Sequence, residues 1–168
     1  MALAPERRGR DTGGVLIYSY TFAPGTPEMW VERIERSTAG LEQAATGILS
    51  LAAQQTGAPL RGRLRIGPPT AGASSALIPI CWVLPDLCGR LDGELRLSPV
   101  AADVTQISLR ASYPSDGAAS PDARHALTEF AAKALVDQVP LATGHALPGA
   151  PVTTAPIVPA SVQGPPGA

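Results

Sequence analysis

The fold is decided by the stretch 105–140, which reads TQISLRASYPSDGAASPDARHALTEFAAKALVDQVP. Residues 105–113 alternate between apolar and polar side chains, which is the period of a strand with one buried face. From Ser120 or Pro121 to about Val139, apolar residues recur at helical spacing, and Pro140 ends the predicted helix. The apolar stripe of this helix is predicted to contain Ala123, Leu127, Phe130, Ala131, Ala134 and Leu135. A strand followed by a long amphipathic helix predicts a sheet covered on one face by that helix.

The residues before this stretch supply the remaining elements. Segments 60–66 and 91–98 alternate like 105–113, whereas 76–84 is apolar on both faces and 15–22 is rich in β-branched and aromatic residues. Thr26, Pro27 and Glu28 form a typical helix start, and a second helix over 41–55 follows Gly40. We therefore predict an α+β fold in which a curved antiparallel sheet wraps around a long C-terminal helix, with two shorter helices after the first strand.

Charged side chains indicate which face of the sheet meets water. They share one parity in each alternating strand, and they are Arg61, Arg63, Arg65, Asp92, Glu94, Arg96 and Arg110. Because successive side chains of a strand point to opposite faces, we expect these residues on the outer surface. The polar groups left for the interior are then mostly tyrosines, with Trp82 or Cys81 and the loop residues Asp86 and Asp116. Tyrosines alone favour orientation of a ligand over proton transfer.

Several short motifs, taken in order, are similar to a known family. Phe22-Ala23-Pro24 with Pro27 and Trp30 precedes Arg65-Ile66-Gly67-Pro68-Pro69, then Ile78-Pro79-Ile80-Cys81-Trp82, and then the strand 91–99. Over about 14–140 this series resembles actinobacterial members of the START-like superfamily, also called SRPBCC or Bet v 1-like, which includes polyketide cyclases and dehydratases. The resemblance implies a helix-grip fold. We count four strands between the helix pair and the last helix, where that fold commonly has six.

The same resemblance implies a pocket between the sheet and the C-terminal helix. The candidate pocket residues are Tyr18, Tyr20, Trp30, Trp82, Leu95, Leu109, Tyr113, Leu127 and Phe130. Family members bind lipids, hormones or polyketides, or catalyse reactions, so the fold alone does not choose an activity. We expect a non-catalytic domain that binds a small hydrophobic molecule. The alternatives are a polyketide cyclase/dehydratase-like enzyme and a scaffold with a packed core that binds a protein partner.

Other function classes find little support in the sequence. There is no catalytic-nucleophile, phosphate-binding or metal-ligand motif, so no catalytic residue, cofactor or metal site is predicted. A net charge of −1 and scattered basic residues give no reason to expect nucleic-acid binding. His125 is expected at the rim of the last helix and His145 in the tail. Cys81 and Cys88 are expected as free thiols, although a hairpin disulfide between them is conceivable.

The chain divides into three parts. Residues 1–13 are expected to be a flexible N-terminus, 14–140 the helix-grip domain, and 141–168 a disordered tail rich in Pro and Ala. Arg7-Arg8 precedes an apolar run, but the serine, threonine and tyrosines in that run are typical of a strand and not of an export signal. No apolar run is long enough to span a membrane. A cytoplasmic location is therefore expected.

Overall fold

A computed structural model describes residues 14–72, 74–115 and 121–143. The predicted flexible N-terminus, most of the predicted tail, Asp116 and His145 lie outside these residues. The elements are β1 (Gly14–Pro24), α1 (Pro27–Arg36), α2 (Thr38–Thr56), β2 (Arg63–Ile66), β3 (Thr70–Ala71), β4 (Ala76–Leu84), β5 (Gly89–Ala101), β6 (Val104–Pro114) and α3 (Pro121–Ala142).

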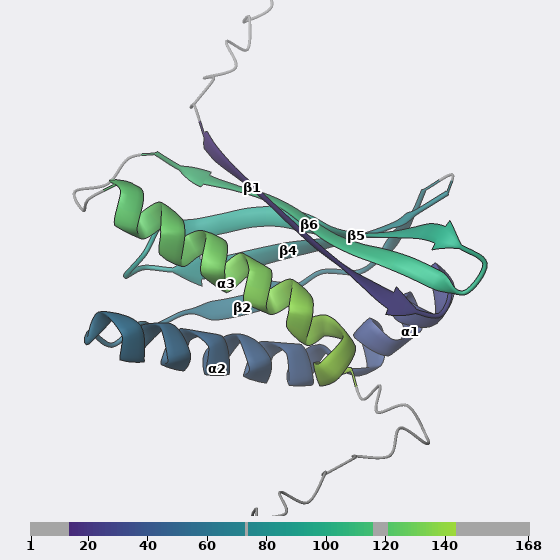
Figure 1. The fold of residues 1–168 in the computed structure, drawn as a ribbon, viewed down its shortest axis with the longest axis horizontal. Coiled ribbons are helices and arrows are strands. Elements are labelled where there is room, and N and C mark those ends of the chain that lie inside the picture. Colours follow the sequence, from purple (N-terminus) through teal and green to yellow (C-terminus); the bar gives the residue numbers. More distant parts are fainter. Residues whose placement is uncertain (1–13, 73, 116–120, 144–168) are drawn as a thin grey trace, which may run out of the picture.

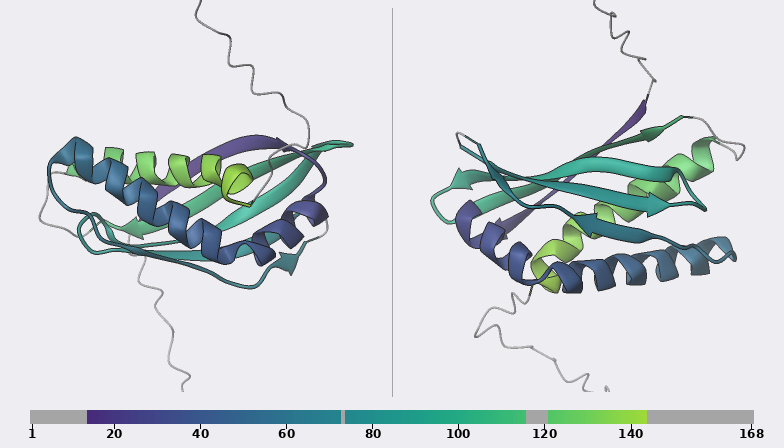
Figure 2. Two further views of the ribbon diagram at one scale, coloured as in Figure 1. Left: turned by 90° about the horizontal axis from the view of Figure 1, so that it is seen from below. Right: turned by 180° about the vertical axis from the view of Figure 1, so that it is seen from behind.

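The strands form one curved antiparallel sheet, and α3 lies across it (Figure 1). The strand order is β1-β6-β5-β4-β2, and the short β3 also pairs with β4. Helix α2 lies beside α3 on the same side of the sheet, and α1 lies at one end (Figure 2). The predicted α+β helix-grip arrangement is confirmed.

The β2–β3 segment differs from the prediction of a single strand followed by a loop. The structure has five strands between the helix pair and α3, because residues 70–71 pair with Leu77 and Ala76. The interruption between β2 and β3 lies opposite Pro79, which has no backbone N–H to donate to a partner strand. There the Gly67 N–H donates to the carbonyl of Pro79 at 2.8 Å. The proline is therefore accommodated by a break in the neighbouring strand.

The helix pair begins as predicted but breaks at a different residue. Thr26 caps α1, because its Oγ1 accepts a hydrogen bond from the Met29 N–H at 3.4 Å. Gly40 does not interrupt the helix, because α2 already begins at Thr38. A Cβ at Gly40 would lie 3.0 Å from the carbonyl oxygen of Ala142. The glycine therefore allows the start of α2 to approach the end of α3 closely.

Helix α3 is longer than predicted and is rotated relative to its predicted stripe. It continues through Pro140 to Ala142, because a proline in the last turn removes only one backbone hydrogen bond near the helix end. Its buried residues are Thr128, Ala131, Ala132, Leu135, Val136 and Val139. Ala123 and Phe130, which were predicted in the stripe, are exposed.

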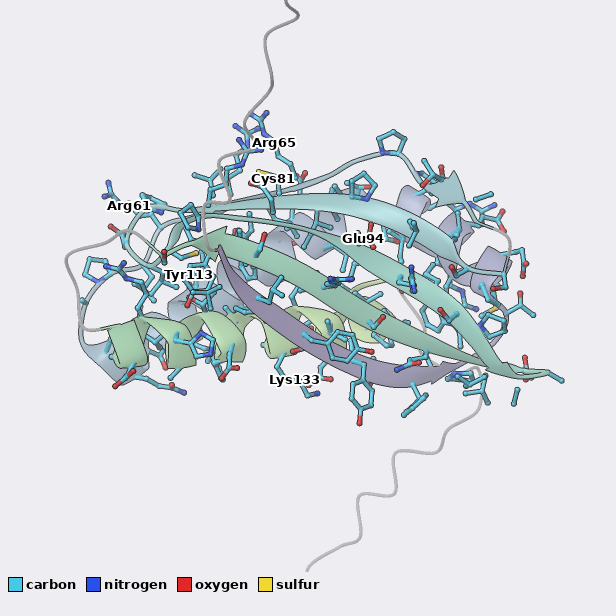
Figure 3. The ribbon with its side chains drawn as sticks, turned by 90° about the horizontal axis from the view of Figure 1, so that it is seen from above. Arg61, Arg65, Cys81, Glu94, Tyr113 and Lys133 are labelled. Atoms are coloured by element: carbon cyan, nitrogen blue, oxygen red, sulfur yellow. The ribbon has the colours of Figure 1, made fainter. Side chains whose placement is uncertain are left out.

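The outer face of the sheet carries the charges, as predicted. Arg65, Cys81 and Glu94 lie on the side of the sheet away from α3, and Tyr113 lies on the side of the helix (Figure 3). In the β5–β6 register Glu94 stands opposite Arg110. The alternation of charged and apolar residues therefore gave the correct orientation of β5 and β6.

The prediction that Tyr18 and Tyr20 point inward is wrong. Tyr18 is 61% exposed and Tyr20 is 48% exposed, whereas Ile17, Ser19 and Ala23 are buried. The register with β6 fixes this orientation, because Ile17 stands opposite Ala111 and Ser19 opposite Leu109, two residues of the inner face. The aromatic rings of β1 therefore form part of the outer surface.

Candidate functional site

Most of the nine predicted pocket residues belong to the core. Trp30, Trp82, Leu95, Leu109 and Tyr113 are buried in one continuous cluster, against which Leu127 packs. Tyr18, Tyr20 and Phe130 are exposed. The structure therefore gathers six of the nine around the core and places three on the surface.

The space beneath α3 is filled by the protein's own side chains. Leu91, Leu95 and Leu109 from the sheet join Leu135 and Val136 from α3 in the same buried cluster. The small residues at positions 131 and 132 of α3 are fully buried against it, and they allow the helix to lie close to the strands. A core packed in this way leaves the indole rings in contact with protein atoms.

One polar atom in this core has no partner. The indole Nε1–H of Trp82 is buried and makes no hydrogen bond to any described residue. In contrast, Nε1 of Trp30 donates to the carbonyl of Pro24 at 3.1 Å. An unpaired buried donor costs about 1–3 kcal/mol, so what Trp82 contributes to stability comes from the burial of its large apolar ring.

A pocket lies at the end of the sheet next to α1. Its volume is about 680 Å³, within the range of small-molecule sites. Three segments far apart in sequence line it, namely the start of α1, the β3–β4 hairpin and the β5–β6 turn. None of the nine predicted pocket residues lines this pocket.

The chemistry of this pocket is apolar with a few hydroxyl groups. Proline, alanine and Val31 supply most of the walls, and Glu28 is the one charged side chain among the described lining residues. Thr70 Oγ1 already donates to the carbonyl of Leu77 at 3.3 Å. Ser74 and Ser75 also line the pocket, and a ligand carbonyl or hydroxyl can bond to their hydroxyls.

A smaller pocket continues along the same side of α1. Its volume is about 240 Å³, and its lining includes Ile34, Glu35 and Thr38. Pro69 lines both pockets, so the two adjoin each other between α1 and the segment that connects β2 to β4. The positions of α1 that line them lie three or four residues apart, which places them on one face of the helix.

A chain of polar contacts joins the end of β6 to α3. The Tyr113 hydroxyl lies 2.9 Å from Nδ1 of His125, and His125 Nε2 lies 3.2 Å from the Glu129 carboxylate. Burial raises the pKa of Tyr113, and the direction of the hydrogen bond between its hydroxyl and Nδ1 depends on the tautomer of the imidazole. This chain can orient the imidazole, and sequence reasoning had placed His125 only as a rim residue.

Cys88 is a buried free thiol. Burial raises the pKa of the Cys88 thiol, which lies beside Thr128 of α3. A thiol held in its neutral form is a poor nucleophile. Cys81 and Cys88 are both free, so no hairpin disulfide forms between them.

An ion pair fixes the turn between β4 and β5 to the start of the β2 segment. The Asp86 carboxylate accepts a hydrogen bond from the Arg61 backbone N–H at 2.8 Å and another from Arg61 Nη2 at 3.3 Å. These hydrogen bonds lower the pKa of Asp86. The stability that Asp86 contributes is therefore complete above its unfolded pKa and is lost as the pH falls through the lower folded value.

Asp86→Asn is expected to weaken the dependence of the free energy of unfolding on pH in the acidic range. The variant should be less stable than the wild type at neutral pH, and the difference should shrink below about pH 4. Urea unfolding of both proteins between neutral and acidic pH measures this difference. An unchanged difference at all pH values would show that the carboxylate charge contributes nothing to stability.

No group of three or more His, Cys, Asp or Glu side chains among the described residues can hold a metal ion. None of the described helices is long and apolar enough to cross a membrane.

The solved structures that this chain resembles include an aromatase/cyclase. The Zhui aromatase/cyclase from Streptomyces sp. R1128 matches 77% of this chain and 88% of its own, with 13% sequence identity and a TM-score of 0.37. No family model matches the chain, and no curated protein matches it.

Proposed function

We propose that this domain binds a small, uncharged and mostly apolar molecule in the pocket beside α1. The observation that carries the proposal is the pocket of about 680 Å³ between α1 and the two hairpins. An apolar pocket with a few polar groups is the usual form of a small-molecule site. The sequence predicted the ligand beneath α3, but that space is occupied by buried side chains.

The lining favours a neutral ligand. Glu28 would repel an anion, and the other described lining residues offer no cation to pair with one. Burial of about 200 Å² of apolar ligand surface would supply roughly 5 kcal/mol before the cost of association. The hydroxyls of Ser74 and Ser75 would then select ligands that carry an oxygen acceptor or donor.

Acid–base catalysis is a second candidate, and the Tyr113–His125–Glu129 chain favours it. A histidine held between a hydroxyl and a carboxylate is a common way to position a general base. None of the three residues lines the pocket beside α1. A substrate would have to reach His125 from the surface, where its side chain is 37% exposed. Ligand binding in the pocket beside α1 is therefore the better supported function.

Filling the pocket is expected to abolish binding of a neutral apolar probe. Ala101 lies at the end of β5 and is exposed, so Ala101→Trp should place an indole in the pocket without disturbing the core. We expect N-phenyl-1-naphthylamine to bind the wild type and to bind this variant at least about tenfold more weakly. Fluorescence titration of the probe measures both affinities.

Ala58→Trp is the matched control. Ala58 is exposed in the segment after α2 and lines none of the pockets described above. This variant should bind the probe like the wild type. Equal affinity of the wild type and Ala101→Trp would contradict the assignment of the pocket.

A further inference from the structure

The outer surface of β1 carries a continuous apolar strip. Leu16, Tyr18, Tyr20 and Phe22 are 64%, 61%, 48% and 57% exposed, respectively. The rings of Tyr18 and Tyr20 have centroids 6.0 Å apart, and those of Tyr20 and Phe22 have centroids 5.6 Å apart. Monomeric proteins rarely expose aromatic side chains in a contiguous row, and such a row is typical of an interaction surface.

The same four residues lie on a free edge of the sheet. β1 pairs only with β6 among the described strands. A Cβ at Gly93 of β5 would lie impossibly close to the carbonyl oxygen of Arg110, so that carbonyl points toward β5. Alternate residues of a strand direct their backbone groups to opposite sides. The backbone N–H and C=O groups of Leu109 and Ala111 therefore point toward β1. Their register partners Ser19 and Ile17 therefore direct their backbone N–H and C=O groups toward β6.

It follows that the even-numbered residues of β1 offer their backbone N–H and C=O groups to the open edge. Natural sheets protect such edges with charged side chains, short strands or bulges. The opposite edge follows this rule, because β2 has only four residues and carries Arg63 and Arg65. β1 has eleven residues and none of them is charged. The two edges of this sheet thus differ in their protection.

We propose that the β1 edge binds a second copy of this chain by antiparallel strand pairing. β1 is self-complementary about Ser19: a twofold axis there places Leu16 opposite the partner's Phe22 and Tyr18 opposite the partner's Tyr20. All four outer side chains then form cross-strand apolar pairs. No charged side chain of β1 opposes its copy, so an identical strand meets no repulsion.

The size of this surface predicts a weak dimer. Three half-exposed aromatic rings and one leucine would bury on the order of 300–400 Å² per copy, well below the roughly 800 Å² per partner of a stable interface. The two-strand seam adds backbone hydrogen bonds. The dimer should therefore form in a concentration-dependent way, and the pocket beside α1 takes no part in it.

Sedimentation equilibrium tests this proposal. From about 10 to about 500 µM, the average mass of the wild type should rise from 17.2 kDa toward twice that value. The double variant Tyr18→Lys with Tyr20→Lys places charges on the seam and should remain monomeric over the same range. Leu51→Lys, at an exposed leucine of α2, is the matched control and should associate like the wild type.

Amide hydrogen exchange on the wild type gives an independent readout. The amides of residues 16, 18, 20 and 22 should exchange more slowly as concentration rises, whereas those of 17, 19 and 21 should be protected at all concentrations. A wild type that stays monomeric would overturn the proposal. So would a lysine variant that still associates, or a dimer that leaves the even-numbered amides unprotected.

Discussion

Trp82→Ala is expected to lower the free energy of unfolding by about 3–5 kcal/mol, the usual cost of removing a large buried aromatic side chain. Trp82 is fully buried on the inner face of β4, where Leu64 and Leu91 stand opposite it on the neighbouring strands. Truncation leaves a cavity that fixed neighbours cannot fill. Urea unfolding followed by circular dichroism measures the change, and Val83→Ala on the exposed side of the same strand should cost far less.

The two tryptophans should respond differently to phenylalanine. Trp30→Phe breaks the hydrogen bond from Nε1 to the Pro24 carbonyl, whereas Trp82→Phe removes a donor that has no partner. Both variants lose similar volume, so Trp30→Phe should be the more costly by about 1 kcal/mol. A loss below about 1 kcal/mol for Trp82→Ala would mean that the side chain borders empty space and not a packed core.

Gly93→Val is expected to destabilise the domain by at least about 3 kcal/mol. A Cβ at this position would lie less than 3.0 Å from the carbonyl oxygen of Arg110 and from the Cα and Cβ of Ala111. Two of these atoms are backbone, so they cannot move without bending the β5–β6 pairing. The glycine lets the two strands approach where the sheet is curved. Thermal unfolding of the variant measures the loss.

Gly47→Ala is the matched control, and its effect should have the opposite sign. Gly47 is exposed in the middle of α2, and nothing lies within 4 Å of a Cβ built there. Alanine should stabilise the helix by about 0.5–1 kcal/mol. A Gly93→Val variant as stable as the wild type would contradict the close approach of β5 and β6 at this position.

The orientation of a strand could be predicted wherever charges marked one face. Arg96 and Arg110 alternate with leucines and an isoleucine, so the buried parity of β5 and β6 followed from the sequence. β1 has no charge, and both of its faces carry large apolar residues. Hydrophobicity therefore could not choose between them, and pairing with β6 decided the orientation. The aromatic strip that results was hidden from sequence reasoning for the same reason.

The candidate site could not be predicted because its residues have no chemical signature. The pocket beside α1 is lined mainly by alanine, proline, serine and threonine from three distant segments. In a sequence, such residues are typical of turns and do not indicate a binding site. The contact between Tyr113 and His125 spans the end of β6 and the first turns of α3. A helix register derived from apolar spacing alone was too imprecise to bring the two together.

Methyl NMR during titration with N-phenyl-1-naphthylamine tests most directly where a ligand binds. The account predicts shifts for the methyl groups of Val31, Ala76 and Ala101, which line the pocket beside α1. The methyl groups of Leu95, Leu109 and Leu135 in the packed core should not move. Shifts confined to those three leucines would contradict the account, because they would place the ligand between the sheet and α3.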